Sequence, residues 1–180
     1  MKVKIGLLII VLGAIATFSL FGTAGAAQDT EQVIPIVNVD PTASLTIVSG
    51  TTGPDNNLID FGNMAAGSTQ TKPLVLGVTA NDAWTLTVSK NQNLTASTPP
   101  YGTIASANFT FTSSAGDPAP AGTPSYVTDT QFGTTATNVV TNGSATSANV
   151  NITYRLVIPA DQPVGTYSAS HTYTLIVGSS

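Results

Sequence analysis

The sequence predicts an all-β fold built from antiparallel sheets. Hydrophobic and polar residues alternate with a period of two in several separate segments, which is typical of strands with one buried face. No segment shows the periodicity of an amphipathic helix. Gly, Pro, Asn and Asp residues separate the alternating segments and predict turns between them.

The chain begins with the pattern of a secretory signal peptide. Lys2 and Lys4 precede an uncharged, mostly apolar stretch over residues 5–27, and Ala24 and Ala26 form the small-residue pair of a cleavage site. We therefore predict cleavage after Ala26 and a protein that is secreted, extracellular or at the cell surface. The alternative is an uncleaved anchor, because the apolar stretch reaches the length of about 20 residues that a bilayer-spanning helix needs.

Removal of the signal peptide would leave an acidic protein. Lys72, Lys90 and Arg155 would remain against nine acidic residues, which gives a net charge of −6. This balance argues against nucleic acid as a partner and against adsorption to anionic lipid, so no membrane contact is expected after cleavage. The sequence has no cysteine, and a domain of this size can bury a sufficient core without disulfides.

The clearest strands are expected at residues 74–79, 84–89, 108–112, 150–158 and 167–177. The first two are joined through Asn81 and Asp82, which predicts a hairpin. Further strands are expected at residues 33–39, 44–49, 58–61, 126–128 and 138–141. Residues 113–124 are rich in Pro, Gly, Ala and Ser and predict a long surface loop.

About nine or ten short strands separated by turns predict an immunoglobulin-like β-sandwich with Greek-key connections, and a closed barrel is the alternative. The predicted organisation is a signal peptide at residues 1–26, a leader with an edge or donor strand at 27–43 and a sandwich domain at 44–180. The predicted core residues occupy single faces of the alternating strands and are Leu74, Leu76, Trp84, Leu86, Phe109, Phe111, Ile152, Tyr154, Leu156, Tyr173 and Leu175.

The sequence offers no convergent set of catalytic groups. His171 is the only histidine, it lies on the apolar face of the last expected strand, and no G-x-S-x-G motif is present. We therefore expect a packed histidine, no catalytic, cofactor or metal site and no enzymatic activity. One loop remains open to two interpretations, a calcium site or a solvated turn, and its oxygen-bearing residues are Asp55, Asn56, Asn57 and Asp60.

Aromatic residues and asparagines provide the remaining candidates. Trp84 shares a strand face with Leu86, which favours a core position over a sugar-binding platform. Three tyrosines are candidates for an aromatic ligand surface: Tyr101, Tyr126 and Tyr167. Four sequons would matter in a host that glycosylates exported proteins, and their asparagines are Asn93, Asn108, Asn142 and Asn151.

The segment over residues 33–39 is apolar and extended in character, and its hydrophobic residues are Val33, Ile34, Ile36, Val37 and Val39. Pro35 has no N–H group, so a strand here belongs at a sheet edge. Two interpretations are open. The segment is either the first strand of its own domain or a strand donated to the sheet of a neighbouring subunit.

Three stretches, VIPIVNVDPTASLTIVSG, LIDFGNMAAGST and VGTYSASHTYTLIV, resemble parts of secreted prokaryotic β-sandwich surface proteins, in particular spore-coat-U-like and pilin subunits. Those families share the order of a leading strand, an L-x-F-G element and a final G-T-Y hairpin, but they often have a disulfide. The single W-x-L motif at residues 84–86 partly resembles WxL cell-wall-binding domains, which usually have two. The resemblance implies a structural role in fibres, coats or surface layers.

From these observations we expect a structural subunit of an extracellular assembly, such as a pilus, fibre or coat, that associates with copies of itself. The polar, weakly charged character of the chain and the candidate donor strand favour this function. The alternative is a surface module that binds cell-wall glycan or other carbohydrate.

Overall fold

The computed structural model describes residues 34–178, and the fold there is all-β with antiparallel sheets, as predicted. The predicted signal peptide and Val33 lie outside the described residues. The chain divides into two units, Met1–Asn38 and Val39–Ser180, and every strand belongs to the second. Within the described residues, none of the elements is a helix with the length and apolar character to cross a membrane.

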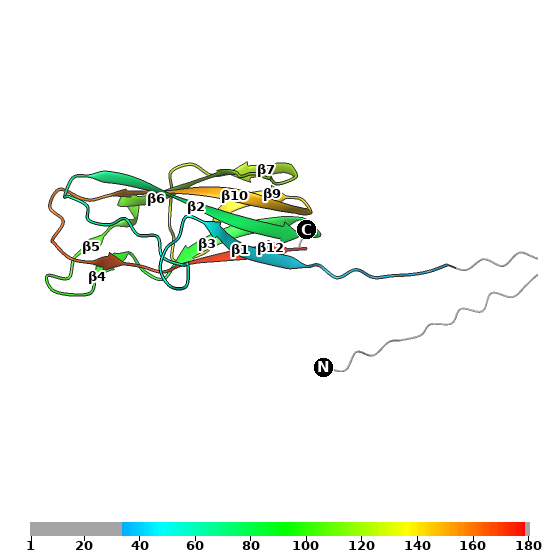
Figure 1. Cartoon of the computed structure of the whole chain (residues 1–180), viewed down its shortest axis with the longest axis horizontal. Helices are drawn as coiled ribbons and strands as arrows, with labels where there is room; N and C mark the ends of the chain where they lie inside the picture. Colours follow the sequence, from blue (N-terminus) through cyan, green and yellow to red (C-terminus); the bar gives the residue numbers. More distant parts are fainter. Residues whose placement is uncertain (1–33, 179–180) are drawn as a thin grey trace, which may run out of the picture. The chain divides into compact units, whose positions relative to one another are not determined.

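The strands form two larger sheets and one small sheet (Figure 1). The five-stranded sheet contains, in spatial order, β1 (Ala43–Ser49), β2 (Thr69–Ala80), β10 (Thr146–Val157), β6 (Phe109–Ala115) and β8 (Thr130–Gln131). The four-stranded sheet contains β12 (His171–Val177), β3 (Trp84–Lys90), β9 (Thr137–Gly143) and β7 (Gly122–Tyr126). The small sheet contains β11 (Tyr167–Ser168), β4 (Leu94–Ala96) and β5 (Thr103–Ile104), and a 3-10 turn, η1 (Ser106–Asn108), precedes β6.

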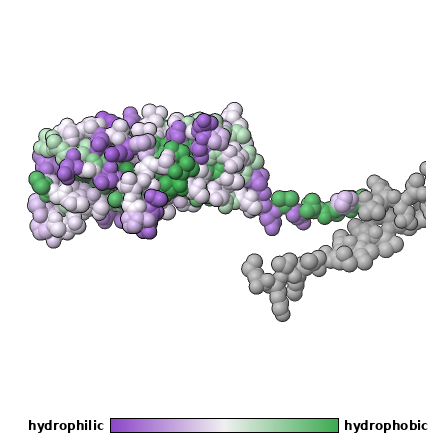
Figure 2. Space-filling view, in the orientation of Figure 1, coloured by the Kyte–Doolittle hydropathy of each residue, from purple (hydrophilic) through white to green (hydrophobic). Residues whose placement is uncertain are grey.

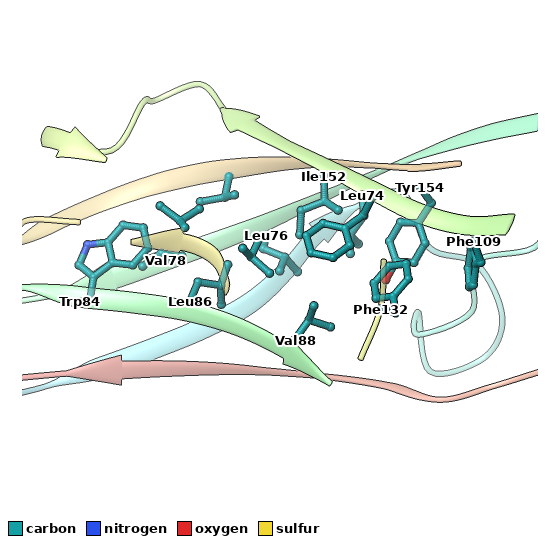
Figure 3. Close-up of a cluster of buried hydrophobic side chains, with 14 of the residues drawn as sticks. Leu74, Leu76, Val78, Trp84, Leu86, Val88, Phe109, Phe132, Ile152 and Tyr154 are labelled. Carbon is teal, nitrogen blue, oxygen red and sulfur yellow. The ribbon is translucent and has the colours of Figure 1, made fainter. Parts of the chain in front are cut away.

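One hydrophobic core joins the two larger sheets. Inward-facing side chains of β2, β6 and β10 pack in the same cluster as those of β3 and β9. Figure 3 shows this cluster extending from Trp84 at one end to Phe109 at the other. Alternation in β2 and β10 places every second side chain on this face, and burial of apolar surface at about 25 cal/mol per Å² is the main stabilising contribution.

Most of the predicted core is confirmed. The predicted residues that are buried are Leu74, Leu76, Trp84, Leu86, Phe109, Phe111, Ile152, Tyr154 and Leu156. Tyr173 and Leu175 pack against the core but are only half-buried, because β12 is an edge strand. Phe132, which is 1% exposed, was not predicted because it lies in a connection without periodicity.

The predicted hairpin over residues 74–89 is wrong. β2 and β3 follow each other through Asn81 and Asp82, but they belong to different sheets. The side chain of Asn81 instead bonds backbone groups of Asp40 and Thr42 ahead of β1. Turn residues specify that the chain reverses, and they do not specify whether the two strands then pair with each other.

Other boundaries also differ from the predictions. The predicted loop over residues 113–124 is shorter than expected and covers residues 116–121, because β6 continues to Ala115 and β7 begins at Gly122. In place of a strand at residues 58–61 there is one isolated bridge between Thr52 and Leu58. The strand expected at residues 126–128 lies earlier, as β7, and the last strand is divided into β11 and β12. Two-residue and three-residue strands such as β4, β5 and β8 are too short to show a period.

Candidate functional site

The segment before β1 is apolar and exposed. A strand was expected over residues 33–39, and residues 34–42 form no strand in the described part of the chain. β1 begins opposite Ala80, the last residue of β2, and residues before Ala43 therefore have no β2 residue to pair with. The large apolar side chains here are 71–85% exposed and belong to Ile34, Ile36, Val37 and Val39.

Residues 40–42 are attached at a defined end of the sheets. Asn81 Nδ2 donates a hydrogen bond to the Asp40 carbonyl oxygen at 3.0 Å, and the Thr42 N–H donates to Asn81 Oδ1 at 2.7 Å. Pro41 lies against Gly178, where an added Cβ would come within 2.9 Å of the Pro41 ring. The chain therefore enters the domain where β2 and β12 end.

On one side of the core, the edge strand β1 lies beside the edge strand β12 (Figure 1). Leu45 pairs with Val78 and Ile47 pairs with Leu76, so both β1 side chains are on the core face of the sheet. Ile47 is nevertheless 47% exposed. Figure 2 shows apolar surface gathered over the region of β1 and β2 on the visible face.

The same incomplete coverage occurs along β12. Val177 pairs with Trp84 and Leu175 pairs with Leu86, and both β3 residues are at most 2% exposed. Their β12 partners, in contrast, are only half-buried. Side chains directly opposite each other share a sheet face, so these β12 residues point toward the core from an edge that no further strand covers in the described residues.

The opposite side of the core is closed by the chain itself. The segment after β7 crosses to β8 and so links the two larger sheets. The Ser113 N–H donates to the Val127 carbonyl oxygen at 2.9 Å, and the Val127 N–H donates to Ser113 Oγ at 2.9 Å. The side with β1 and β12 is therefore the more open of the two.

His171 is a packed residue, as its sequence position suggested. Its ring stacks on Phe132 with 3.9 Å between centroids, and its Nδ1 lies 3.3 Å from the Tyr154 hydroxyl. That hydroxyl shares a 2.8 Å hydrogen bond with the Tyr173 hydroxyl, and His171 Nε2 is buried without a hydrogen-bond partner. Burial, together with the smaller effect of the Lys90 charge, lowers the pKa of His171 to about 4. The imidazole is therefore neutral near pH 7.

Lys90 is a buried charge that the sequence did not reveal. It is 8% exposed, and its Nζ donates to Asn93 Oδ1 at 2.5 Å and to Ser106 Oγ. Burial lowers the pKa of Lys90. The alternation of β3 places position 90 on the core face, and its partner Asn93 follows three residues later, but Ser106 comes from a separate segment that sequence spacing does not connect.

The candidate calcium loop has the contacts of a turn. Asp60 Oδ1 accepts a 2.7 Å hydrogen bond from the Gly62 N–H, and Thr51 Oγ1 donates to the Asn56 carbonyl oxygen at 2.6 Å. Asn56 has a φ of 49°, which Asn tolerates well in turns. Over residues 34–178, no three His, Asp or Glu side chains form a group able to hold a metal ion.

The aromatic candidates do not form one ligand surface. Trp84 is 2% exposed and its Nε1 donates a 2.8 Å hydrogen bond to the Ser144 carbonyl oxygen, which confirms a core position and excludes an exposed platform. Tyr101 is exposed, whereas Tyr126 on β7 and Tyr167 on β11 are half-buried in different sheets.

The structure separates the four sequons by exposure. Asn142 is exposed, with a φ of 58°, near the end of β9. Asn93 accepts hydrogen bonds from Lys90, and Asn151 Nδ2 donates to the Ala115 carbonyl oxygen at 3.0 Å. Asn108 is half-buried at the end of η1. Asn142 is therefore the sequon best presented for modification.

In comparisons with known proteins, the chain matches no family model and no curated protein. The function proposed below therefore rests on the residues and contacts of the chain itself.

Proposed function

We propose that this protein is a structural subunit of an extracellular assembly, a pilus, fibre or surface coat, in which subunits are joined by donation of the N-terminal strand at residues 33–39. In this proposal, residues 1–26 are the signal peptide, which directs export and is then removed. The two larger sheets and their shared core form an immunoglobulin-like sandwich that serves as the rigid body of the subunit.

The observation that carries the proposal is the exposed apolar segment without a strand partner. Ile36 is 85% exposed and Val37 is 83% exposed. Full burial of a large aliphatic side chain that is otherwise in water is favourable by about 1.5–3 kcal/mol. A partner that buries this segment therefore gains several kcal/mol before the cost of ordering the segment.

The domain also offers the complementary feature. β1 and β12 are edge strands with half-exposed core-facing side chains, and an edge strand presents unpaired N–H and C=O groups. Addition of an extended segment to such an edge uses main-chain hydrogen bonds for affinity and side-chain packing for specificity. One chain thus has both halves of a self-complementary contact.

Charge does not oppose this contact, although the protein is acidic. Residues 32–39 contain no charged side chain, and neither do β1 and β12 apart from His171, which is neutral near pH 7. Two copies that each have a net charge of −6 after cleavage repel at a distance, and an uncharged contact avoids adding repulsion at close range.

Negative-stain microscopy of exported protein tests the proposal. We expect filaments or extended assemblies for the natural sequence and isolated particles for Ile36→Asp, which places a charge in the donated strand without touching the core. Val164→Asp is the matched control, because Val164 is 93% exposed and lies in the turn before β11. Isolated particles for the natural sequence would contradict the proposal and favour a monomeric surface-binding module.

A further inference from the structure

We infer that the free edge of β12 receives residues 34–39 of a second copy, in antiparallel orientation, and that this orientation joins subunits head to tail. The inference rests on the proposed function and adds the receiving strand, the orientation and the geometry of the assembly. It follows from four features: the backbone groups of β12, the side chains beside them, the position of Pro35 and the point where the segment leaves its own domain.

The backbone of β12 has a defined free side. The Gly178 N–H donates to the Ala83 carbonyl oxygen, and the Asn91 N–H donates to the Ser170 carbonyl oxygen. These residues continue the β12–β3 register, so the even-numbered positions of β12 exchange hydrogen bonds with β3. The N–H and C=O groups of Tyr173, Leu175 and Val177 therefore point toward the free edge.

Pro35 determines which side of the donated segment can pair. Backbone groups of alternate residues point to the same side of a strand, and Pro35 has no N–H to offer. The side with Ile34 and Ile36 has complete donors and acceptors, so this side faces β12 and Pro35 faces away. A proline at an edge position of this kind is the arrangement that sheets tolerate.

Side-chain chemistry matches this pairing. In an antiparallel ladder, residues directly opposite each other point to the same face. Leu175 and Val177 direct their backbone groups to the free edge and their side chains to the core face. Ile34 and Ile36, directly opposite them, would therefore also point their side chains toward the core. Ile34 opposite Val177 and Ile36 opposite Leu175 cover the two half-buried aliphatic residues of β12.

The lengths also agree. β12 has seven residues, and the segment over residues 34–39 has six. At about 3.3 Å per residue, the two strands differ in length by one residue. In the register given above, Val39 lies opposite Thr172, and both side chains are on the outer face. The two strands thus overlap along nearly their full lengths without an unpaired apolar end.

Orientation decides what kind of assembly results. Asp40 and Thr42 are bonded to Asn81, at the end of the domain where β12 finishes. In an antiparallel pair, residue 39 lies near the start of β12 in the next copy, so the Asn81 end of one subunit meets the opposite end of the next. This contact is heterologous and can repeat as a fibre. A parallel pair would bring two Asn81 ends together and could close as a dimer.

Charge repulsion disfavours the parallel contact. Asp40 and Asp82 lie at the Asn81 end. The half of the sheets farther from Asn81 has charges of both signs, with Lys72 near the start of β2, Arg155 near the end of β10 and Asp161 in the turn after β10. Parallel addition would place the aspartates of two copies side by side, whereas antiparallel addition places them against an end that also has basic side chains.

The other edge of the same sheet is a poorer receiver. β7 contains Pro124 in its five residues, and the segment that follows β7 is bonded through Val127 to Ser113 of β6 in the other sheet. Its exposed residues Thr123 and Ser125 offer no aliphatic surface for Ile34 and Ile36 to cover. β12 therefore combines free backbone groups with uncovered apolar side chains, a combination that β7 lacks.

Disulfide trapping in the full-length chain tests the inference, because the natural sequence has no cysteine to interfere. Protein with Val39→Cys is mixed separately with size-tagged protein with Thr172→Cys, Ile176→Cys or Ser125→Cys, and all four positions are exposed. Directly opposite residues have Cα atoms about 4.5–5.5 Å apart, which suits a disulfide. We expect the mixed disulfide with Thr172→Cys to form at least about tenfold faster than with Ser125→Cys, because pairing raises the effective concentration of the two thiols toward about 1 mM.

Each alternative gives a different result. Preferential trapping with Ile176→Cys would mean parallel addition and would overturn the head-to-tail geometry while leaving strand donation intact. Preferential trapping with Ser125→Cys would overturn the choice of β12. Equal, slow trapping with all three partners would also overturn the inference, and the sedimentation behaviour of the natural sequence then decides whether the proposed function fails with it. Assembly would leave that function standing with another receiving surface, and a monomer would remove both.

Discussion

Replacement of Trp84, the one aromatic residue of β3, by Ala should strongly destabilise the domain. Trp84 is 2% exposed, and its indole fills the end of the core next to Gly143, where an added Cβ would overlap the ring. Truncation of a large buried aromatic residue costs about 3–5 kcal/mol, which includes the cavity that remains. The hydrogen bond from Nε1 to the Ser144 carbonyl oxygen contributes about 1 kcal/mol of this.

Urea unfolding followed by far-ultraviolet circular dichroism measures this effect. With a slope of about 2 kcal/mol per molar urea, the midpoint should fall by about 2 M. Trp84→Phe should lose less, because it retains most of the packing and removes the hydrogen bond. Tyr101→Ala is the control at an aromatic residue that is 69% exposed, and its stability should change by at most about 0.5 kcal/mol. A loss below about 1 kcal/mol for Trp84→Ala would refute the placement of the indole in the core.

Three other predictions follow from individual contacts. As the pH falls from 6.5 to 4, unfolded chains bind a proton at His171 before the folded protein does, so the free energy of unfolding should decrease by about 3 kcal/mol. Chemical denaturation of His171→Phe should show that this part of the pH dependence is lost. Gly143→Ala should destabilise the domain by about 1–3 kcal/mol in thermal or urea unfolding, because the new methyl group overlaps the Trp84 ring, and an unchanged midpoint would contradict that contact. In a host that glycosylates exported proteins, mass spectrometry should find modification at Asn142 in preference to the three less exposed sequons, and a higher occupancy at any of those three would show that exposure does not govern the choice.

The sequence predicted the long strands well, because a half-buried strand has a simple period. Ile152 and Tyr154 alternate with Asn151, Thr153 and Arg155, and both are buried. Connectivity was harder to predict. Asn81 and Asp82 indicate a turn in either a hairpin or a crossing between sheets, and only the pairing of β2 with β1 and β10 shows which occurs.

The candidate site could also be predicted only in part from the sequence. Exposure of Ile36 and its neighbours is consistent with an apolar segment that has no partner in its own sheet, and the sequence alone left that question open. The half-exposed core face of β12 depends on which strands lie beside it, so alternation could not reveal it. Likewise, the contacts of His171 with Phe132 and Tyr154 join three separate parts of the chain, and no local spacing indicates them.

Sedimentation velocity of the exported protein over a wide concentration range tests the central claim most directly. If residues 33–39 are donated between subunits, the mass distribution should move to larger species as concentration rises, without a single closed oligomer, and Ile36→Asp should remain monomeric at every concentration. The control Val164→Asp should assemble like the natural sequence. A single monomeric species for the natural sequence over the whole range would contradict strand donation.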